Sequence, residues 1–377
     1  MKIETIELVN EKWEYNQETF QDKKEADVVF VFGETKDFKQ NKHFDYLRDL
    51  YSNSVIIGCT SSGNVLGPEV SNASLTSTAV QFDHTTVKFS HIDFHEDDNL
   101  ESLSEQLVNQ LDSEGLRHIF VLSDGLLING SELVRGINKV SHVPVSGGMA
   151  GDGDRFQETW VIANDYPKQR RIVALGFYGE KLTISSCAYG GWSEFGAHRV
   201  ITRSEGNVLY EIDNQPALEL YKTYLGDYAK ELPNSGLRFP LSIKENDDDV
   251  EVIRTLLAID EEENSITFAG DVPEGFRARL MKPDLDILID AASQAAAKIK
   301  NANEKQALGL VVSCVGRKII LGPMVDEELE AIEDELGSNV SLTGFYSYGE
   351  ISPFEHDDLH CNLHNQTVTL TVLYEDE

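Results

Sequence analysis

The stretch TGFYSYGEISP, residues 343–353, combines features that ordinary strands avoid. Two glycines, Gly344 and Gly349, enclose three aromatic rings, and the carboxylate of Glu350 follows directly. Apolar residues on both sides indicate that the stretch ends a buried strand. Glycine at a strand end permits a bulge or the close approach of another group. The stretch therefore predicts either a simple bulge into the next strand or the wall of a ligand site.

The order of elements around this stretch occurs three times. A strand, a helix, a second strand that ends in glycine and a further strand are indicated over 27–82, 118–163 and 307–374. The alignment matches Gly58, Ser61, Gly63 and Asn64 with Gly344, Ser347, Gly349 and Glu350, and it places Gly151 and Asp152 on the last two. The sequence thus predicts an α/β protein of two domains. Its mixed β-sheets are covered by helices and built partly from a repeated strand–helix–strand–hairpin unit.

A segment that does not follow the repeat separates the second and third units. Strands are indicated over 170–179, 181–192 and 198–212, and a helix begins near Pro216 behind a polar cap. The clearest helical pattern of the chain covers 283–302. We place a domain boundary near residue 214. The expected division is an N-terminal arm over 1–26, a first domain over 27–214 and a second domain over 215–370.

The composition excludes several classes of partner. The chain has 377 residues, of which 65 are acidic and 32 are basic, giving a net charge of −33. Nucleic acids and anionic membrane surfaces require a basic footprint, so neither is an expected partner. A hydrophobic content of 41% allows a sizeable core.

Localisation is inferred from what the sequence lacks. The N-terminus MKIETIELVN has no apolar signal core, and no run approaches the length of a membrane span. The cysteines are far apart and form no C-x-x-C pair, which favours reduced thiols. We expect a cytoplasmic protein without membrane insertion. The cysteines are Cys59, Cys187, Cys314 and Cys361.

The opening stretch supplies most of the candidate site. If it lines a pocket, its rings form an apolar wall and Glu350 anchors an ammonium group of the ligand. Arg317 follows another strand end and pairs either with a ligand carboxylate or with Glu350. The alternative is that Glu350 caps a local turn and faces solvent. The candidate ligand-binding residues are Phe345, Tyr346, Tyr348, Glu350, Arg317, Trp192 as a lid, and Asp124.

Catalytic motifs are weak. The glycines of GGMAGDG, residues 147–153, lead into a strand, whereas a dinucleotide fingerprint leads into a helix. The stretch from Gly58 to Gly63 does not form a nucleophile elbow. Ser123 and Asp124 lie at a strand end, but no histidine partner is indicated by spacing. We therefore do not expect an enzyme.

Histidines near the C-terminus raise the question of a metal. In an extended chain His360 and His364 share a face but lie roughly 13 Å apart, and Cys361 points to the other face. Zinc ligands must meet within about 2.3 Å of one ion, so we expect no metal site unless a loop that includes His356 brings them together. A single histidine such as His364 remains a possible axial ligand of haem.

Several motifs in order resemble those of the FIST family, named for F-box and intracellular signal transduction. They are GGMAGDG, GGWSEFGAHRVITRSEGNVLYEIDNQPALELY, LRFPLSI, DVPEGF, SCVGRK, GFYSYGEISP and HNQT, and the resemblance covers roughly residues 27–370, both the N-terminal and the C-terminal FIST domain. The resemblance implies a sensory module that binds small ligands, with amino acids proposed. Some bacterial members are described as haem-binding nitric oxide sensors. The family supplies no settled catalytic set to carry over.

The resemblance sets the functional expectation. FIST segments often stand beside kinase, cyclic-di-GMP or chemotaxis output domains, whereas here both FIST halves fill the chain. We expect a bacterial, cytoplasmic sensory protein that binds a small polar metabolite between its halves and uses no cofactor. Its signal then passes to a separate histidine kinase, cyclic-di-GMP enzyme or chemotaxis receptor. The alternative is a haem-based sensor of nitric oxide.

Overall fold

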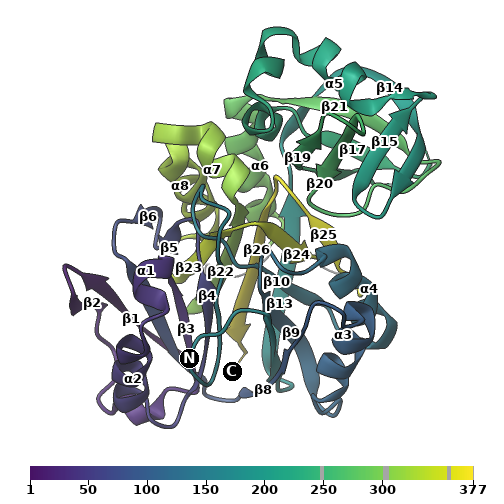
Figure 1. Cartoon of the computed structure of the whole chain (residues 1–377). Helices are drawn as coiled ribbons and strands as arrows, with labels where there is room; N and C mark the ends of the chain where they lie inside the picture. The colour runs from purple at the N-terminus through teal and green to yellow at the C-terminus, as the bar shows by residue number, and fades with distance from the viewer. Residues whose placement is uncertain (247–249, 300–304, 355–357, 377) are drawn as a thin grey trace.

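The three repeated units form three six-stranded mixed sheets around a common core, and a further β-domain is inserted into the third unit (Figure 1). The computed structural model describes residues 1–246, 250–299, 305–354 and 358–376. The α/β class, the mixed sheets and the repeated unit are confirmed. The repeat departs from the expected hairpin, because the strand after each glycine turn leaves its own sheet.

The first unit forms a sheet in the order β11-β4-β3-β7-β1-β2. β3 reads VVFVFG and is fully buried, as a central strand with both faces covered must be. β4 runs parallel to it and β7 antiparallel. The elements are β1 (Lys2–Val9), β2 (Lys12–Gln17), η1 (Lys23–Glu25), β3 (Val28–Gly33), α1 (Thr35–Phe38), α2 (Asn41–Leu50), β4 (Val55–Thr60), β5 (Asn64–Leu66), β6 (Glu69–Ser71) and β7 (Leu75–Gln81). The expected arm over 1–26 thus contributes two strands.

The second unit repeats this path with the order β25-β24-β10-β9-β12-β8. β9 and β10 are parallel, and β12 returns antiparallel to β9. Helices α3 and α4 lie side by side on the outer face of this sheet (Figure 1). The elements are β8 (Thr86–Asp93), α3 (Leu100–Asn109), β9 (Leu116–Ser123), α4 (Gly130–Val140), β10 (Val145–Met149), β11 (Val161–Ala163) and β12 (Arg171–Tyr178).

The third unit has the order β13-β26-β22-β23-β5-β6. β22 and β23 are parallel, and β26 is antiparallel to β22. Helices α6 and α8 pack against each other and cover this sheet. The elements are β13 (Leu182–Tyr189), α6 (Leu285–Ala297), β22 (Ala307–Cys314), α7 (Val315–Leu321), η5 (Gly322–Met324), α8 (Val325–Leu336), β23 (Val340–Ser347), β24 (Gly349–Ser352), β25 (Asn362–His364) and β26 (Val368–Glu375).

Each unit donates strands to the sheet of another unit: two from the first (β5 and β6), two from the third (β24 and β25) and one from the second (β11). β5 of the first unit pairs with β23 of the third, β24 of the third pairs with β10 of the second, and β11 of the second pairs with β4 of the first. The exchange is cyclic, and it relates the units by an approximate threefold axis. Every sheet contains strands from two units, so the three units cannot be separated into independent repeats. We refer to the three units together as the body.

A ring of three backbone hydrogen bonds closes around this axis. In each unit the amide four residues after Gly58, Gly147 or Gly344 donates to a carbonyl of a neighbouring unit. The bonds are Ser62 N to Tyr346 O (2.8 Å), Gly151 N to Thr60 O (2.9 Å) and Tyr348 N to Met149 O (3.1 Å). These three bonds establish which positions of the units are equivalent.

The structural equivalence of positions in the three units corrects one part of the alignment that was made from the sequence. Ser61 donates to Asn64 and Ser347 donates to Glu350, so the first and third units match as expected. Asp152, however, occupies the position of Gly63 and Gly349, one residue away from the position expected for it. The second unit has Ala150 in place of the serine. It therefore lacks the hydrogen-bonded side-chain pair that would have fixed its sequence alignment with the other two units.

Glycine is required where the two parallel strands of each unit approach. Gly58, Gly147 and Gly344 lie opposite Val31, Val121 and Val311 in their sheets, and an added Cβ at any of them would overlap the valine carbonyl oxygen. The glycine that opens the quoted stretch is therefore a packing residue that recurs in all three units.

The central core lies between the three sheets. The equivalent side chains of Phe30, Phe120 and Leu310 belong to one buried cluster, and the rings of Phe30 and Phe120 meet edge to face at 6.0 Å. Aromatic pairs in this geometry contribute about 0.5–1.5 kcal/mol beyond the area they bury. Apolar residues at the same place in each unit thus join the units into one body.

The inserted domain covers residues 192–283 and projects from one end of the body (Figure 1). Its eight-stranded sheet packs on α5 around a core of its own. The elements are β14 (Trp192–Glu205), β15 (Val208–Ile212), β16 (Gln215–Pro216), α5 (Ala217–Leu225), η2 (Gly226–Glu231), η3 (Asn234–Arg238), β17 (Leu241–Lys244), β18 (Val252–Arg254), β19 (Leu256–Asp260), β20 (Ser265–Phe268) and β21 (Arg277–Pro283). The boundary placed near residue 214 lies at the turn between β15 and β16.

The close approach at the repeated glycine can be tested by substitution. We expect Gly344→Ala to lower the free energy of unfolding by about 3 kcal/mol or more, because the methyl group overlaps backbone that cannot rotate away. Gly190→Ala is the control, since its Cβ would meet only Trp192 Cδ1 at 3.4 Å. Urea unfolding measures both, and equal stability of the two variants would contradict the packing role.

Candidate functional site

A cavity of about 500 Å³ lies where the strand ends of the second and third units face the inserted domain. In sheets with parallel strands, ligands bind outside the carboxyl ends of those strands. Loops after β9, β10 and β22 form one wall, and η3, β19 and β20 form the other. The lining residues are Gly125, Leu126, Ile128, Asn129, Gly130, Met149, Asp154, Arg155, Phe156, Asn207, Pro233, Asn234, Leu237, Thr255, Leu256, Leu257, Phe268, Ala269, Gly270, Cys314, Val315, Tyr348 and Leu363.

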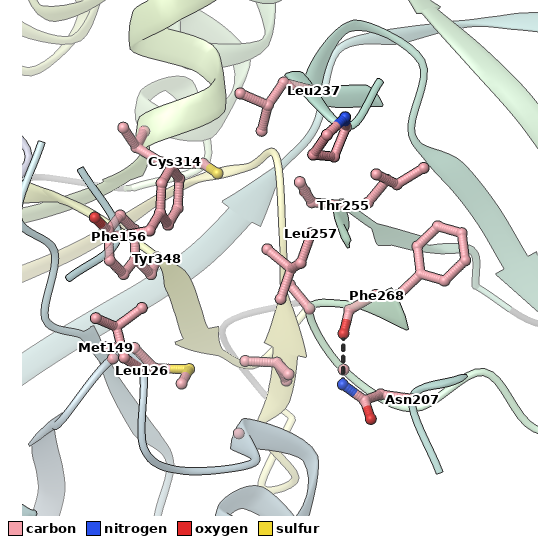
Figure 2. Close-up of a pocket in the computed structure, with 18 of the residues that line it drawn as sticks. Leu126, Met149, Phe156, Asn207, Leu237, Thr255, Leu257, Phe268, Cys314 and Tyr348 are labelled. Carbon is pink, nitrogen blue, oxygen red and sulfur yellow. Dashed lines mark hydrogen bonds between the residues drawn. The ribbon is translucent and has the colours of Figure 1, made fainter. Parts of the chain in front are cut away.

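Most of this lining is apolar, and side chains from both parts of the chain reach it. Leu126 and Met149 come from the body, whereas Leu237 and Leu257 come from the inserted domain (Figure 2). Leu257 is 44% exposed although it is a large apolar residue. A concave site that is mainly apolar and has few polar groups is the usual form of a small-ligand pocket.

One buried polar group among the described lining residues has no partner. Thr255 is only 5% exposed, and its Oγ1 makes no hydrogen bond within the described part of the chain. By contrast, the Asn207 amide donates to the Phe268 carbonyl at 2.8 Å. A buried hydroxyl without a partner costs roughly 1–3 kcal/mol, so a ligand group that bonds Thr255 would recover that energy.

Tyr348 is the residue of the quoted stretch that reaches the cavity. Its ring stacks on Phe156 with centroids 4.5 Å apart, and both rings line the site. Its hydroxyl donates to the Asp152 carboxylate and lies 3.1 Å from the Gly153 carbonyl. Burial raises the pKa of Tyr348, and the bond to Asp152 raises this pKa further, so the phenol stays protonated.

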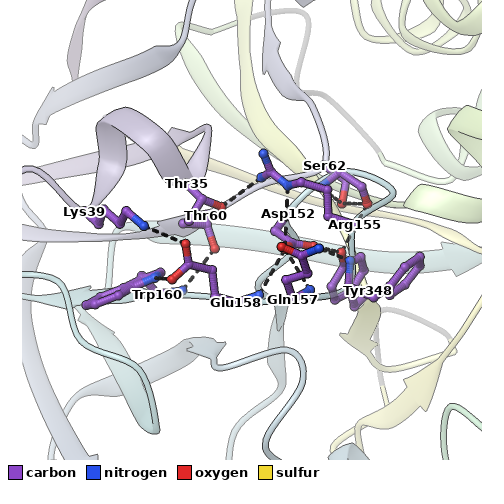
Figure 3. Close-up of polar contacts among 12 residues, drawn as sticks. Thr35, Lys39, Thr60, Ser62, Asp152, Arg155, Gln157, Glu158, Trp160 and Tyr348 are labelled. Carbon is purple, nitrogen blue, oxygen red and sulfur yellow. Dashed lines mark hydrogen bonds and ion pairs between the residues drawn. The ribbon is translucent and has the colours of Figure 1, made fainter.

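Asp152 holds the loop that carries Phe156 and Arg155. Its carboxylate accepts from the backbone N–H groups of Phe156, Gln157 and Glu158 at 2.9, 3.0 and 3.1 Å (Figure 3). Arg155 Nε lies 3.8 Å from the same carboxylate, and its Nη2 donates to Thr35 Oγ1 at 3.1 Å. This loop is therefore fixed at its base, while Arg155 and Phe156 point outward.

Two rings of the quoted stretch belong to the core and not to a pocket wall. Phe345 is fully buried and stacks on Phe32 at 4.8 Å. Tyr346 is also fully buried, and its hydroxyl donates to Glu328 at 2.8 Å. Neither side chain has surface left for a ligand. Phe345 and Tyr346 are consecutive residues of β23, so their side chains point into different buried cores. Of the three rings predicted to form the wall, Tyr348 is the one that lines the cavity.

Arg317 is likewise a buried structural residue. Its Nε donates to Glu328 Oε1 at 2.6 Å, and its Nη2 donates to the Leu288 carbonyl at 2.7 Å. Its Nη1 donates to the Gly190 carbonyl. The hydrogen-bonded partner of Arg317 is Glu328 rather than Glu350. Its donors are used by fixed acceptors, so the expected pairing with a ligand carboxylate is not supported.

The buried pair gives a clear stability prediction. Arg317→Met leaves the Glu328 carboxylate buried without its cation, and we expect a loss of about 3–5 kcal/mol. The double variant Arg317→Met/Glu328→Gln removes both charges and should recover part of that loss. Denaturant unfolding of the unliganded protein measures both. Unchanged stability of Arg317→Met would restore a ligand-binding role for this residue.

Glu350 anchors the third unit internally. It is fully buried and accepts from Ser347 Oγ at 2.6 Å, Thr367 Oγ1 at 2.9 Å and Thr367 N at 3.2 Å. It does not face solvent, as the capping alternative required, and it does not line the cavity. Burial raises the pKa of Glu350 to about 8, and the three hydrogen bonds oppose that rise. The equivalent Asn64 makes the same serine contact with a neutral amide.

This shift predicts a dependence of stability on pH. Glu350 is more protonated in the folded state than in the unfolded chain, so its contribution is complete below the ordinary pKa of 4.5 and is lost as pH rises through about 8. We expect Glu350→Gln to remove that loss. At the alkaline end of this window the free energy of unfolding of the variant should exceed that of the parent by roughly 2 kcal/mol. Urea unfolding across the window measures both proteins, and parallel profiles would contradict the assignment.

Asp124 and Trp192 also have structural roles. The Asp124 carboxylate accepts from Leu126 N, Leu127 N, Thr159 Oγ1 and Arg170 N at 2.8–3.0 Å, so it shapes the loop that lines the cavity. Trp192 begins β14, and its Nε1 donates to the Gln366 carbonyl at 2.8 Å. It does not line the cavity, and it anchors the start of the inserted domain to the body.

The histidines considered as metal ligands do not converge. Among the described residues, no group of three or more histidine, cysteine or acidic side chains is arranged to hold a metal, and His356 lies outside them. His364 is buried with its Nε2 2.9 Å from the Ser352 carbonyl, and burial lowers its pKa to about 4. Among the described residues that line the cavity there is no histidine.

The residues that do line the cavity were largely missed by sequence reasoning. Phe156, Thr255 and Leu257 come from segments with no motif, and one wall of the cavity belongs to the inserted domain. One usable signal was present. The loop after β10 is equivalent to the quoted stretch, and the same reasoning applied there points to Asp152 and Phe156.

Comparison with known proteins identifies the family. The FIST N domain matches residues 27–215, and the FIST C domain matches residues 217–353. The chain therefore belongs to the FIST family, which confirms the resemblance seen in its motifs. FIST domains are sensory domains of signal transduction that bind small molecules. No helix in the described ranges is long and apolar enough to cross a membrane.

Individual relatives add little about function. The uncharacterised protein MJ1623 of Methanocaldococcus jannaschii is 21% identical over 371 residues, covering 89% of this chain and 72% of that protein. A cyanuric acid hydrolase from A. caulinodans matches with 9% identity and a TM-score of 0.37, covering 93% of this chain and 90% of the other. A second cyanuric acid hydrolase structure gives a TM-score of 0.32 at 9% identity, covering 94% and 92%. Similarity at this level identifies no shared activity.

Proposed function

We propose that this protein senses a small amphipathic metabolite, which binds in the cavity between the body and the inserted domain. The observation that carries the proposal is the cavity itself, whose largely apolar lining comes from both parts and includes the unpartnered Thr255 hydroxyl. A ligand placed there contacts strand ends of the body and β19 of the inserted domain together. Its binding energy therefore depends on how the two parts are arranged.

The lining favours a particular ligand chemistry. A volume of about 500 Å³ and the stacked pair of Phe156 and Tyr348 suit a molecule with an apolar or aromatic portion. Thr255 suits one hydrogen-bonding group, and Arg155 at the edge suits an anionic group. An amino acid with a large apolar side chain belongs to this class. Recognition of its charges by Glu350 and Arg317 is not part of the proposal.

We propose a binding role without catalysis. Two carboxylates that shape the loops of the cavity, those of Asp124 and Asp152, each accept several backbone N–H groups. A carboxylate held in this way is stabilised as an acceptor and is a poor proton shuttle. The signal then passes to a separate protein, for which a histidine kinase, a cyclic-di-GMP enzyme and a chemotaxis receptor are the candidates. Pull-down with each output class tests this step.

Ligand binding is tested by blocking the cavity with a charge. We expect Leu257→Asp to keep the fold, because Leu257 is 44% exposed, and to abolish the thermal stabilisation that apolar metabolites give the parent. A saturating ligand at 100 times its dissociation constant should stabilise the parent by about 2.7 kcal/mol. The measurement is a thermal-shift screen of a metabolite library, repeated on the variants with each hit.

Leu285→Asp is the matched control for this substitution. Leu285 is 36% exposed and lies on α6, outside the cavity, so the control should respond to each hit as the parent does. Thr255→Val should weaken only hits that carry a hydrogen-bonding group. A hit that stabilises Leu257→Asp and the parent equally would place the binding site elsewhere.

A further inference from the structure

A second cavity, of about 380 Å³, lies at the ends of β3 and β4 in the first unit. The loop of residues 152–155 separates it from the first cavity, and Asp154 and Arg155 line both. In contrast to the first cavity, its lining is mainly polar. The lining residues are Glu34, Ser61, Ser62, Gly63, Asn64, Val70, Ser71, Asn72, Ala73, Asp152, Gly153, Asp154, Arg155 and Lys318.

Lys318 is the cation at the inner side of this cavity. It reaches from α7 over Gly63, and its Nζ donates to the Ser62 carbonyl at 2.6 Å. Among the described residues no carboxylate lies within 4.0 Å of this Nζ, although the side chain is partly buried. Burial lowers the pKa of Lys318, and the more distant Glu34 and Asp154 oppose that change. An ammonium group in this position lacks a close counter-ion.

The rim of the cavity carries mainly the opposite charge. Glu34 and Asp154 line it and are exposed, and Arg155 stands between the two cavities. A simple anion would be attracted to Lys318 but would meet these carboxylates at the entrance. A simple cation would meet the carboxylates but would be repelled by Lys318. A molecule with an anionic end and a hydrogen-bond-donating end satisfies both parts of the lining.

We propose that this cavity is a second binding site, specific for a small carboxylate that carries an ammonium or hydroxyl group at its other end. The ligand carboxylate accepts from Lys318, and its donor group faces Glu34 and Asp154. The proposal does not rest on the function proposed for the first cavity. Because the loop of residues 152–155 lines both, occupation of one site is expected to alter affinity at the other.

Four probes of equal chain length separate the chemical requirements. They are γ-aminobutyrate, γ-hydroxybutyrate, butyrate and butylamine, and binding is measured by saturation-transfer NMR on the full chain. We expect the first two to bind, butyrate to bind more weakly and butylamine not to bind. Binding of none of the four, or binding of butylamine as strongly as γ-aminobutyrate, would overturn the proposal.

Variants locate the binding to Lys318. Lys318→Met should lower affinity for γ-hydroxybutyrate at least about tenfold, the equivalent of one lost charge-assisted hydrogen bond. Lys36→Met, which changes an exposed lysine of α1, should bind as the parent does. Leu257→Asp should also bind these probes normally, so failure of the first site and failure of the second are distinguishable. Equal affinity of Lys318→Met and the parent would overturn the assignment.

A measurement on the unmodified protein covers the case in which Lys318→Met does not fold. Reductive methylation followed by mass spectrometry reports how accessible each lysine is. γ-Hydroxybutyrate should slow the modification of Lys318 and leave that of Lys36 unchanged. Equal modification of Lys318 with and without the probe would contradict binding at this site.

Discussion

The ring of three backbone hydrogen bonds around the approximate threefold axis is the constraint on which the rest of the structure depends. Each bond joins a different pair of units, and each lies just beyond the strand that carries Gly58, Gly147 or Gly344. An unpaired buried backbone group costs about 1–3 kcal/mol, so the strand ends must meet in register. They meet only if the parallel strands approach as closely as glycine permits. The cyclic exchange of β5, β24 and β11 follows, because each chain leaves its own sheet at the axis and reaches a neighbouring one.

The same constraint determines where ligands can be bound. Chain segments that leave the axis form loops at one end of the body, and both cavities lie among those loops. The loop that starts at Asp152 has a distinct position, since its carboxylate is fully buried while Arg155 and Phe156 reach the two cavities. A rigid base with outward side chains is the arrangement that positions a binding site precisely enough for selectivity.

The repeat and the sheet class could be predicted from sequence because both leave periodic marks. Buried strands read as apolar runs, and the repeated glycine is required by a backbone contact that only glycine allows. The candidate site could not be predicted in the same way. Glu350 and Arg317 are charged residues at strand ends, which is how ligand anchors also look in sequence. Only the structure shows that Ser347, Thr367 and Glu328 already satisfy them. The cavity itself depends on how an inserted domain of 192–283 sits on the body, and no local pattern encodes that placement.

The attachment of the inserted domain suggests how binding would become a signal. Its chain leaves the third unit after β13 and returns before β22, and its contacts with the body include several hydrogen bonds and an ion pair. Asp271 accepts from the Asn129 side chain at 3.0 Å and pairs with Arg135, while Arg254 donates to the Leu363 carbonyl at 3.1 Å. The exposed Asp271–Arg135 pair contributes little net energy, and parts of a chain joined largely by polar contacts commonly move relative to each other. A ligand that touches both sides can shift this arrangement by as much as its affinities for the two states differ. The apolar lining shared between body and insert therefore supplies the energy that the polar contacts alone do not.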